Sequence, residues 1–294
     1  MAGRDSWTGV FLILGGALLF GVMPSAAAFA YDAGANALFL MLSRAAIGVV
    51  SLLFFIKVTG RRAQITAGSL RRSWLAGVSH SLAAFGLLAS IRYIDISLVS
   101  IIAFMYPFPV AVAAHLKGET ALTLPVLALM LLATAGMVLV LGVTFSSINL
   151  VGVALATLAM ASFSVMIMAM AKLTREVGAP NSNLLMTIWS VLIFALIALL
   201  GPPSGLVSGI MVPQTMAGWG FVLLVGLTFA IGYLCFFMST NLIGAARASL
   251  LSTAEPVLMI LCAVAVVGEV LSPLQWLGVV VMVSSLSLSE VVRR

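Results

Sequence analysis

Long apolar stretches dominate the chain and are separated by short loops. They cover residues 8–31, 36–57, 73–93, 97–116, 124–142, 150–172, 183–200, 217–241, 245–267 and 273–291. Each is about 18–26 residues long, which is the length that an α-helix needs to cross the hydrocarbon core of a bilayer. We therefore predict an all-α membrane protein with ten transmembrane helices.

The composition supports this fold class. The chain has 294 residues, of which 63% are hydrophobic and only 7% are charged, whereas soluble domains carry roughly 25% charged residues. A soluble enzyme is therefore excluded. The net charge of +6 does not indicate a nucleic-acid partner, because the basic residues lie in loops between apolar stretches. We expect the partners to be the lipid bilayer and a small molecule.

The basic residues also predict an orientation. If the N-terminus is cytoplasmic, twelve basic residues fall on the cytoplasmic side, Arg92 alone falls on the opposite side, and Arg44 lies within the second span. This asymmetry follows the positive-inside rule, so we predict that both termini face the cytoplasm. The twelve are Arg4, Lys57, Arg61, Arg62, Arg71, Arg72, Lys117, Lys172, Arg175, Arg247, Arg293 and Arg294.

The second half of the chain repeats features of the first, at a shift of 145 to 150 residues. We predict two repeats of five spans each, over residues 1–145 and 146–294. Because five is odd, the second repeat starts on the opposite side of the membrane, and the repeats are inverted. The matches, in order, are Leu40–Met41 with Leu185–Met186, Trp74 with Trp219, Ser100 with Ser249, Pro107 with Pro256, and Gly118–Glu119 with Gly268–Glu269.

One acidic residue lies deep inside an apolar stretch. Glu255 is followed by Pro256 in the span 245–267. A carboxylate at this depth is costly unless it has a partner or faces water. The proline removes a backbone N–H and frees a carbonyl one turn back. Transporters use such a site to hold a substrate or a proton. The alternative is a structural kink whose glutamate pairs with a neighbouring helix.

These motifs resemble the EamA-type transporters of the drug/metabolite transporter superfamily. The resemblance rests on Tyr106-Pro107 followed by Gly118-Glu119, on Glu255-Pro256 followed by Gly268-Glu269 and by Gln275-Trp276-Leu277-Gly278, and on Arg44. The first copy departs from the pattern, because it has Tyr106 where the second has Glu255. The resemblance implies a secondary transporter of the bacterial inner membrane that moves a small metabolite, an amino acid or a related amphiphile, out of the cytoplasm by alternating access. It does not identify the substrate.

Arg44 and Tyr106 are the strongest candidates besides Glu255 for binding substrate. Arg44 is the one basic residue well inside a span, so it needs a partner. That partner is either Glu255 or a substrate carboxylate, unless the side chain extends to the outer interface. Tyr106 occupies the repeat position equivalent to Glu255, and we predict that both line one central cavity. The alternative for Tyr106 is a packing role with a satisfied hydroxyl.

A histidine and several aromatic residues complete the predicted substrate site. His80 lies in the third span between two serines; it is either a proton relay or a hydrogen-bonded packing residue. Aromatic side chains would stack on an apolar or cationic substrate, although each taken singly is as well explained by packing. The aromatic candidates are Phe20, Phe163, Trp189 and Tyr233.

Motifs for catalysis, nucleotide binding and metal binding are missing from the sequence. We therefore predict no enzyme activity, no cofactor and no metal. Transport would depend on an ion gradient, with protons as the candidate coupling ion, on exchange, or on the gradient of the substrate itself. A homodimer stays open. The competing functions are a multi-span membrane enzyme and a receptor without transport activity.

Overall fold

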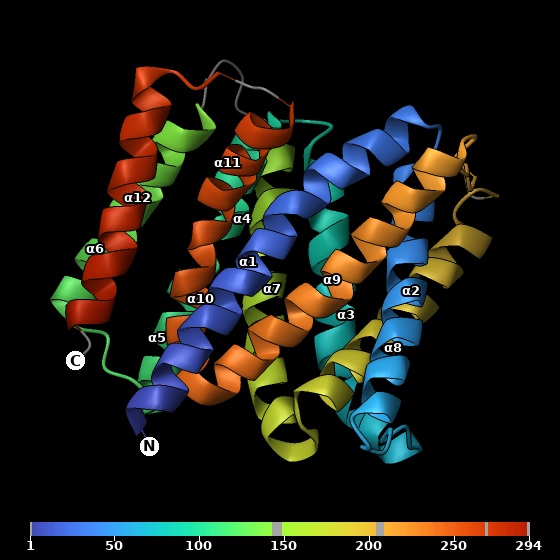
Figure 1. Ribbon diagram of the computed structural model, residues 1–294, viewed down its shortest axis with the longest axis horizontal. Coiled ribbons are helices and arrows are strands. Elements are labelled where there is room, and N and C mark those ends of the chain that lie inside the picture. Colours follow the sequence, from blue (N-terminus) through green and yellow to red (C-terminus); the bar gives the residue numbers. More distant parts are fainter. Residues whose placement is uncertain (1, 143–148, 204–208, 268–269, 293–294) are drawn as a thin grey trace.

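The computed structural model describes residues 2–142, 149–203, 209–267 and 270–292. In these ranges the chain is helical and contains no strand (Figure 1). The helices are α1 (Ala2–Asp32), α2 (Ala37–Val58), α3 (Ala67–Ser90), α4 (Ile96–Phe104), α5 (Pro107–Leu116), α6 (Leu124–Leu141), α7 (Leu150–Val177), α8 (Ala179–Leu200), α9 (Met216–Ile243), α10 (Ala245–Leu251), the 3₁₀ turn η1 (Ser252–Ala254), α11 (Glu255–Val267) and α12 (Pro273–Val292).

Eight helical segments within the described ranges are long and apolar enough to cross a membrane. The chain is therefore a multi-span membrane protein, as its composition predicts. Helix α3 is not among the eight, and its buried face carries several serines and His80. The described apolar part of α12, Pro273–Ser289, is shorter than the other spans. The length and apolar composition of the described helices therefore do not confirm the predicted total of ten spans.

Two of the apolar stretches are broken near their middle. The stretch 97–116 divides into α4 and α5 at Met105 and Tyr106, whose N–H groups donate to the carbonyls three residues back, 3.2 Å away in both cases. Pro107 then starts α5, where its missing N–H costs no helical hydrogen bond. Because these hydrogen bonds span three residues instead of four, the backbone turns more tightly here than in an α-helix.

The second break separates α10 from α11 by the turn η1. Here hydroxyl groups donate to carbonyls three residues earlier: Ser252 to Ser249 at 2.7 Å, and Thr253 to Leu250 at 2.6 Å. Such bonds compete with the regular ladder of the helix, and Pro256 removes one donor from it. Glu255, the first residue of α11, therefore lies directly at the break.

Helices from the two halves pack against each other throughout the bundle. Helix α1 lies against α9, α3 against α7, and α2 against α8, while α6 and α12 form a pair at one edge (Figure 1). The backbones of α6 and α12 approach closely at Gly136 and Gly278. A Cβ added at Gly136 or Gly278 would lie only 3.0 or 2.7 Å from the carbonyl oxygen of the other glycine. Small residues allow this approach of two backbones in a membrane.

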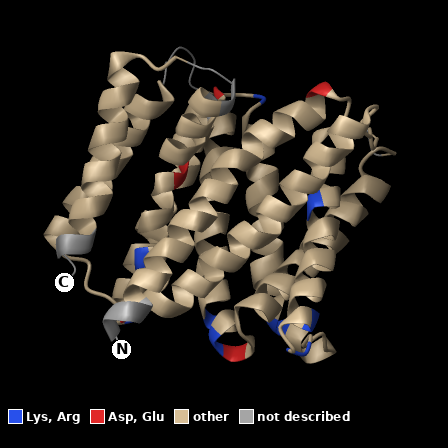
Figure 2. Cartoon of the chain, viewed as in Figure 1, with Lys and Arg blue, Asp and Glu red and all other residues tan. Residues whose placement is uncertain are grey.

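The loops carry most of the charge, and Lys and Arg gather mainly at the end of the bundle where α2 leads to α3 and α7 to α8 (Figure 2). Gly118 ends α5 with a φ of 70°. The N–H groups of Gly118 and Glu119 donate to His115 and Ala114, both at 2.9 Å, which is the pattern of a Schellman cap. Gly118 and Glu119 therefore cap the end of α5; their match in the repeat, Gly268–Glu269, lies outside the described residues.

Candidate functional site

Tyr233 of α9 is the centre of a buried aromatic cluster. Its ring centroid lies 4.9 Å from that of Phe20 on α1, 5.4 Å from that of His80 on α3, and 5.1 and 5.5 Å from those of Phe229 and Phe237. The fold thus brings three candidate residues together from three helices. Sequence reasoning missed Phe229, although its spacing of four residues from Tyr233 places both on one face of a helix.

Arg44 projects from α2 onto this cluster. Its guanidinium carbon lies 5.0 Å from the centroid of Phe229, a distance at which the ring face attracts a cation. The Nε atom is buried and has no hydrogen-bond partner among the described residues. Within the described ranges Arg44 forms no ion pair with Glu255. Of the two partners predicted for Arg44, Glu255 is therefore not bound, and Arg44 keeps an unused hydrogen-bond donor.

Tyr106 connects the two broken helices. Its hydroxyl is hydrogen-bonded to the hydroxyl of Ser252, in the 3₁₀ turn before Glu255. Its ring stacks on Phe163 of α7 with 5.7 Å between centroids. The hydroxyl of Ser164 donates to the Tyr106 carbonyl at 3.2 Å. Ser252 was not singled out from the sequence; the only signal was its place three residues before the buried acid.

Glu255 lies beside these tyrosines without being bonded to them. Its carboxylate interacts electrostatically with the phenols of Tyr106 and Tyr233, and Tyr233 also interacts with Arg44. The side chain is half-buried, and none of the hydrogen bonds or ion pairs made by the described residues involves it. The acid therefore lacks the internal partner that a purely structural kink would require.

Trp189 and His80 make specific contacts within the bundle. The indole N–H of Trp189 on α8 donates to the Leu70 carbonyl at 3.1 Å and to the Ser73 hydroxyl at 3.2 Å, both on α3. Nδ1 of His80 lies 2.9 Å from the Ser190 hydroxyl oxygen. These contacts match the packing alternative for both residues, and their roles in substrate binding and proton relay stay predictions.

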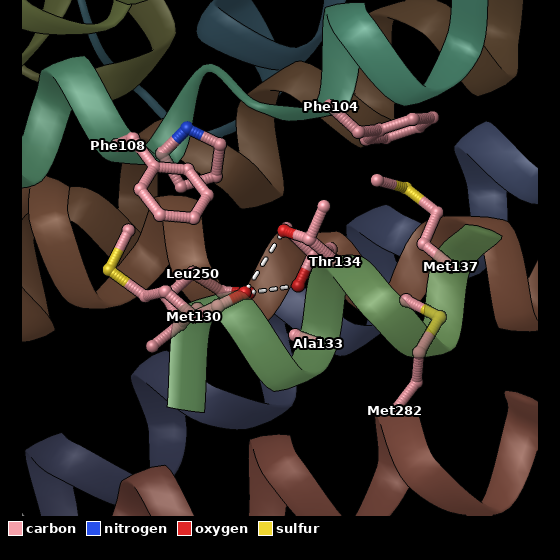
Figure 3. Close-up of a pocket in the computed structure, with 10 residues that line it drawn as sticks. Phe104, Phe108, Met130, Ala133, Thr134, Met137, Leu250 and Met282 are labelled. Carbon is pink, nitrogen blue, oxygen red and sulfur yellow. Dashed lines mark hydrogen bonds between the residues drawn. The ribbon is translucent and has the colours of Figure 1, made fainter. Parts of the chain in front are cut away.

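A small pocket lies between the two broken helices and α6 (Figure 3). Pro107 and Thr253 line it from the broken helices, while Met130, Thr134 and other residues of α6 close its far side. The hydroxyl of Thr134 is occupied, because it donates to the Met130 carbonyl at 3.0 Å. The pocket has room for about one water molecule. It contains none of the predicted site residues and is too small for a metabolite.

The remaining sequence-based exclusion concerns metals. Among the described residues, no group of three or more His, Cys, Asp or Glu side chains is arranged to hold a metal ion. The chemistry available at the centre of the bundle is therefore one guanidinium, one carboxylate, two phenols, an imidazole and several phenyl rings. Groups of these kinds can bind the charged and apolar parts of a small molecule.

Comparison with known proteins identifies the second half of the chain. Residues 150–290 match the EamA-like transporter family. This part of the chain belongs to that family. The match confirms the resemblance drawn from Glu255-Pro256 and the residues after it, and it is consistent with the drug/metabolite transporter superfamily. The EamA-like segment contains Glu255, Tyr233, Phe163 and Trp189.

The whole fold also has a solved counterpart. A crystal structure of a protein superposes with a TM-score of 0.83, covering 98% of this chain and 99% of the other at 16% sequence identity. At this identity the likeness shows the fold alone. No curated protein sequence matches the chain significantly. The candidates outside the EamA-like match, Arg44, Tyr106, Phe20 and His80, therefore rest on their geometry.

Proposed function

We propose that this chain is a secondary transporter that exports a small metabolite, an amino acid or a related amphiphile, across the bacterial inner membrane by alternating access. The observation that carries the proposal is Glu255. This acid lies at a helix break inside an EamA-like segment, and the described residues offer its carboxylate no hydrogen bond. Intramembrane carboxylates of this kind hold substrates or protons.

The packing of the bundle supports two inverted repeats. If the halves 1–145 and 146–294 exchange places, the α1–α9 contact becomes the α7–α3 contact, and the α2–α8 and α6–α12 contacts map onto themselves. Each half also has one broken helix, with its break just before Pro107 or Pro256. Rocking of two such repeats around a central site is the usual basis of alternating access.

The charges at the centre support an amphiphilic substrate. Arg44 and Glu255 carry opposite charges, and Tyr233 interacts with both. Arg44 would take a carboxylate of the substrate, Glu255 would take an ammonium group or a proton, and the rings of Phe20, Tyr233 and Phe163 would cover the apolar part. Trp189 and His80 would support this site from α8 and α3.

The orientation is part of the proposal. The basic loops support cytoplasmic termini, which cysteine labelling would test. An impermeant thiol reagent added to intact cells should label a cysteine introduced at Gln214, in the loop 201–216, and should not label one introduced at Gln64, in the loop 59–72. The opposite pattern would contradict the predicted orientation.

Flux in proteoliposomes tests the activity directly. The purified chain would be reconstituted and offered a panel of labelled amino acids and amphiphilic drugs, with and without a pH gradient. We expect at least one compound to move faster than in protein-free liposomes, and a response to the gradient if protons are the coupling ion. Binding without flux would favour a receptor, and chemical conversion of the compound would favour a membrane enzyme.

A further inference from the structure

The connection between α2 and α3 concentrates positive charge on one surface. Arg61, Arg62, Arg71 and Arg72 lie within twelve residues, with no acid among them, and all four are exposed. The corresponding connection in the second half, 201–215, contains no charged residue. A general preference for basic cytoplasmic loops does not require this density at one site. Such a cluster attracts an anionic group at the membrane surface.

This connection is held in place by hydrogen bonds. Both ends of the Asn181 amide on α8 bind it: Nδ2 donates to the Arg62 carbonyl at 3.3 Å, and Oδ1 accepts the Gln64 N–H at 3.0 Å. The Ser69 hydroxyl donates to the Gln64 carbonyl at 2.6 Å, within a capping box that starts α3 at Thr66. The arginines therefore project from an ordered backbone, which lowers the entropy cost of binding.

The surface beside the arginines suits a lipid headgroup. Arg71 and Arg72, with Ala67 and Gly68, line a surface hollow. One turn further along α3, Trp74 is 51% exposed, and Ile65 in the loop is 44% exposed. Residues three apart share a helix face, so the guanidinium of Arg71 and the indole of Trp74 lie on the same face of α3. Tryptophan is typical of the membrane–water interface, and arginine binds phosphate oxygens bidentately.

We propose that Arg61, Arg62 and Arg71 form a binding site for the phosphate group of an anionic phospholipid on the α2–α3 face. Arg72 contributes less, because its guanidinium lies 3.5 Å from Glu176 in an ion pair. The phosphate would sit in the hollow against Arg71, Arg61 and Arg62 would add positive charge from the loop before α3, and the acyl chains would run along Trp74 into the bilayer. This site is separate from the Glu255 centre and does not depend on transport activity.

Lipid binding to the full-length protein tests the site. The detergent-purified protein would be titrated with phosphatidylglycerol or phosphatidylcholine, and bound lipid counted by native mass spectrometry. We expect the triple variant R61Q/R62Q/R71Q to bind phosphatidylglycerol at least about tenfold more weakly than the wild type, since each arginine near an anionic surface contributes to the attraction. Binding of phosphatidylcholine should not change. Circular dichroism would verify that the variant is folded, with each single variant as a second measure.

The matched control is Arg92→Gln, an exposed arginine after the other end of α3. It should leave phosphatidylglycerol binding unchanged. The proposal is wrong if R61Q/R62Q/R71Q binds phosphatidylglycerol like the wild type, or if Arg92→Gln weakens binding as much. A further arm adds inorganic phosphate at millimolar concentration. If phosphate displaces the lipid completely, the hollow takes free phosphate and the assignment to a lipid is overturned.

Discussion

The two broken helices have similar backbones but leave their key side chains in different states. At the first break, the Tyr106 hydroxyl is paired with Ser252 and the Tyr106 carbonyl accepts a bond from Ser164. At the second, Glu255 lies at the start of α11, and its carboxylate has no hydrogen bond from the described residues. A phenol is satisfied by one hydroxyl partner, whereas a carboxylate at this depth needs charge, a proton or water. We therefore expect Tyr106 to brace the two breaks and Glu255 to exchange partners during transport.

The largest expected effect comes from Glu255→Gln, which preserves size and polarity but removes the charge. Hydrogen bonds to charged groups contribute about 1.5–3 kcal/mol, so we expect the apparent affinity for a cationic group to fall about 10- to 100-fold. If the acid carries a proton instead, pH-driven net flux should be lost while exchange persists. Proteoliposome flux at several pH values measures both outcomes. A stable variant with wild-type flux and an unchanged pH profile would make the two breaks functionally equivalent.

The second prediction concerns Arg44, the other charged residue that interacts with Tyr233. Arg44→Gln should weaken substrates that carry a carboxylate by about tenfold, because a charge-assisted hydrogen bond is lost. Amines without a carboxylate should be affected much less. Competition of both compound classes against one labelled substrate measures this difference. Equal weakening of the two classes would argue that Arg44 stabilises the bundle rather than binding the substrate.

The Tyr106–Ser252 bond is expected to affect stability more than transport. Tyr106→Phe and Ser252→Ala should each lower the stability of the protein by about 1 kcal/mol. The double variant should cost little more than Ser252→Ala alone, because Ser252→Ala already removes the bond to Tyr106 together with the bond to the Ser249 carbonyl. Thermal unfolding in detergent gives the cycle, with flux measured in parallel. Strict additivity would mean that the two hydroxyls act independently and that this bond does not join the breaks.

The smallest effect is expected at Glu119, an acid that follows the broken helix of the first half. Glu119, beyond the end of α5, pairs with Arg175 at 3.3 Å, and both side chains are partly exposed. Exposed ion pairs contribute little, so Glu119→Gln should change stability by less than about 0.5 kcal/mol and leave flux unchanged. This variant is the matched control for Glu255→Gln. A flux loss as large as that of Glu255→Gln would mean that the position of the acid at the break is not what matters.

Part of the site was accessible from the sequence because its signal is local. An acid and a proline inside an apolar stretch identify Glu255 at once, and the repeat directs attention to Tyr106. Phe20, His80 and Tyr233 were also named, and they meet in one cluster. Trp189 shows the limit of this reasoning. It was chosen as an aromatic residue in a span, yet its N–H donates to α3, and only the facing helix reveals such a bond.

The amino-acid sequence alone predicts the membrane class, the apolar spans, the broken helix at Glu255 and the EamA-like character of the second half. All of these depend on apolar length and on residues close together along the chain. The packing of the helices is needed to show that Arg44 lies on Phe229 and not on Glu255, and that Ser252 is bonded to Tyr106. Such partners depend on the rotation and depth of helices distant in sequence. Packing between helices sets both quantities, and no local pattern records them.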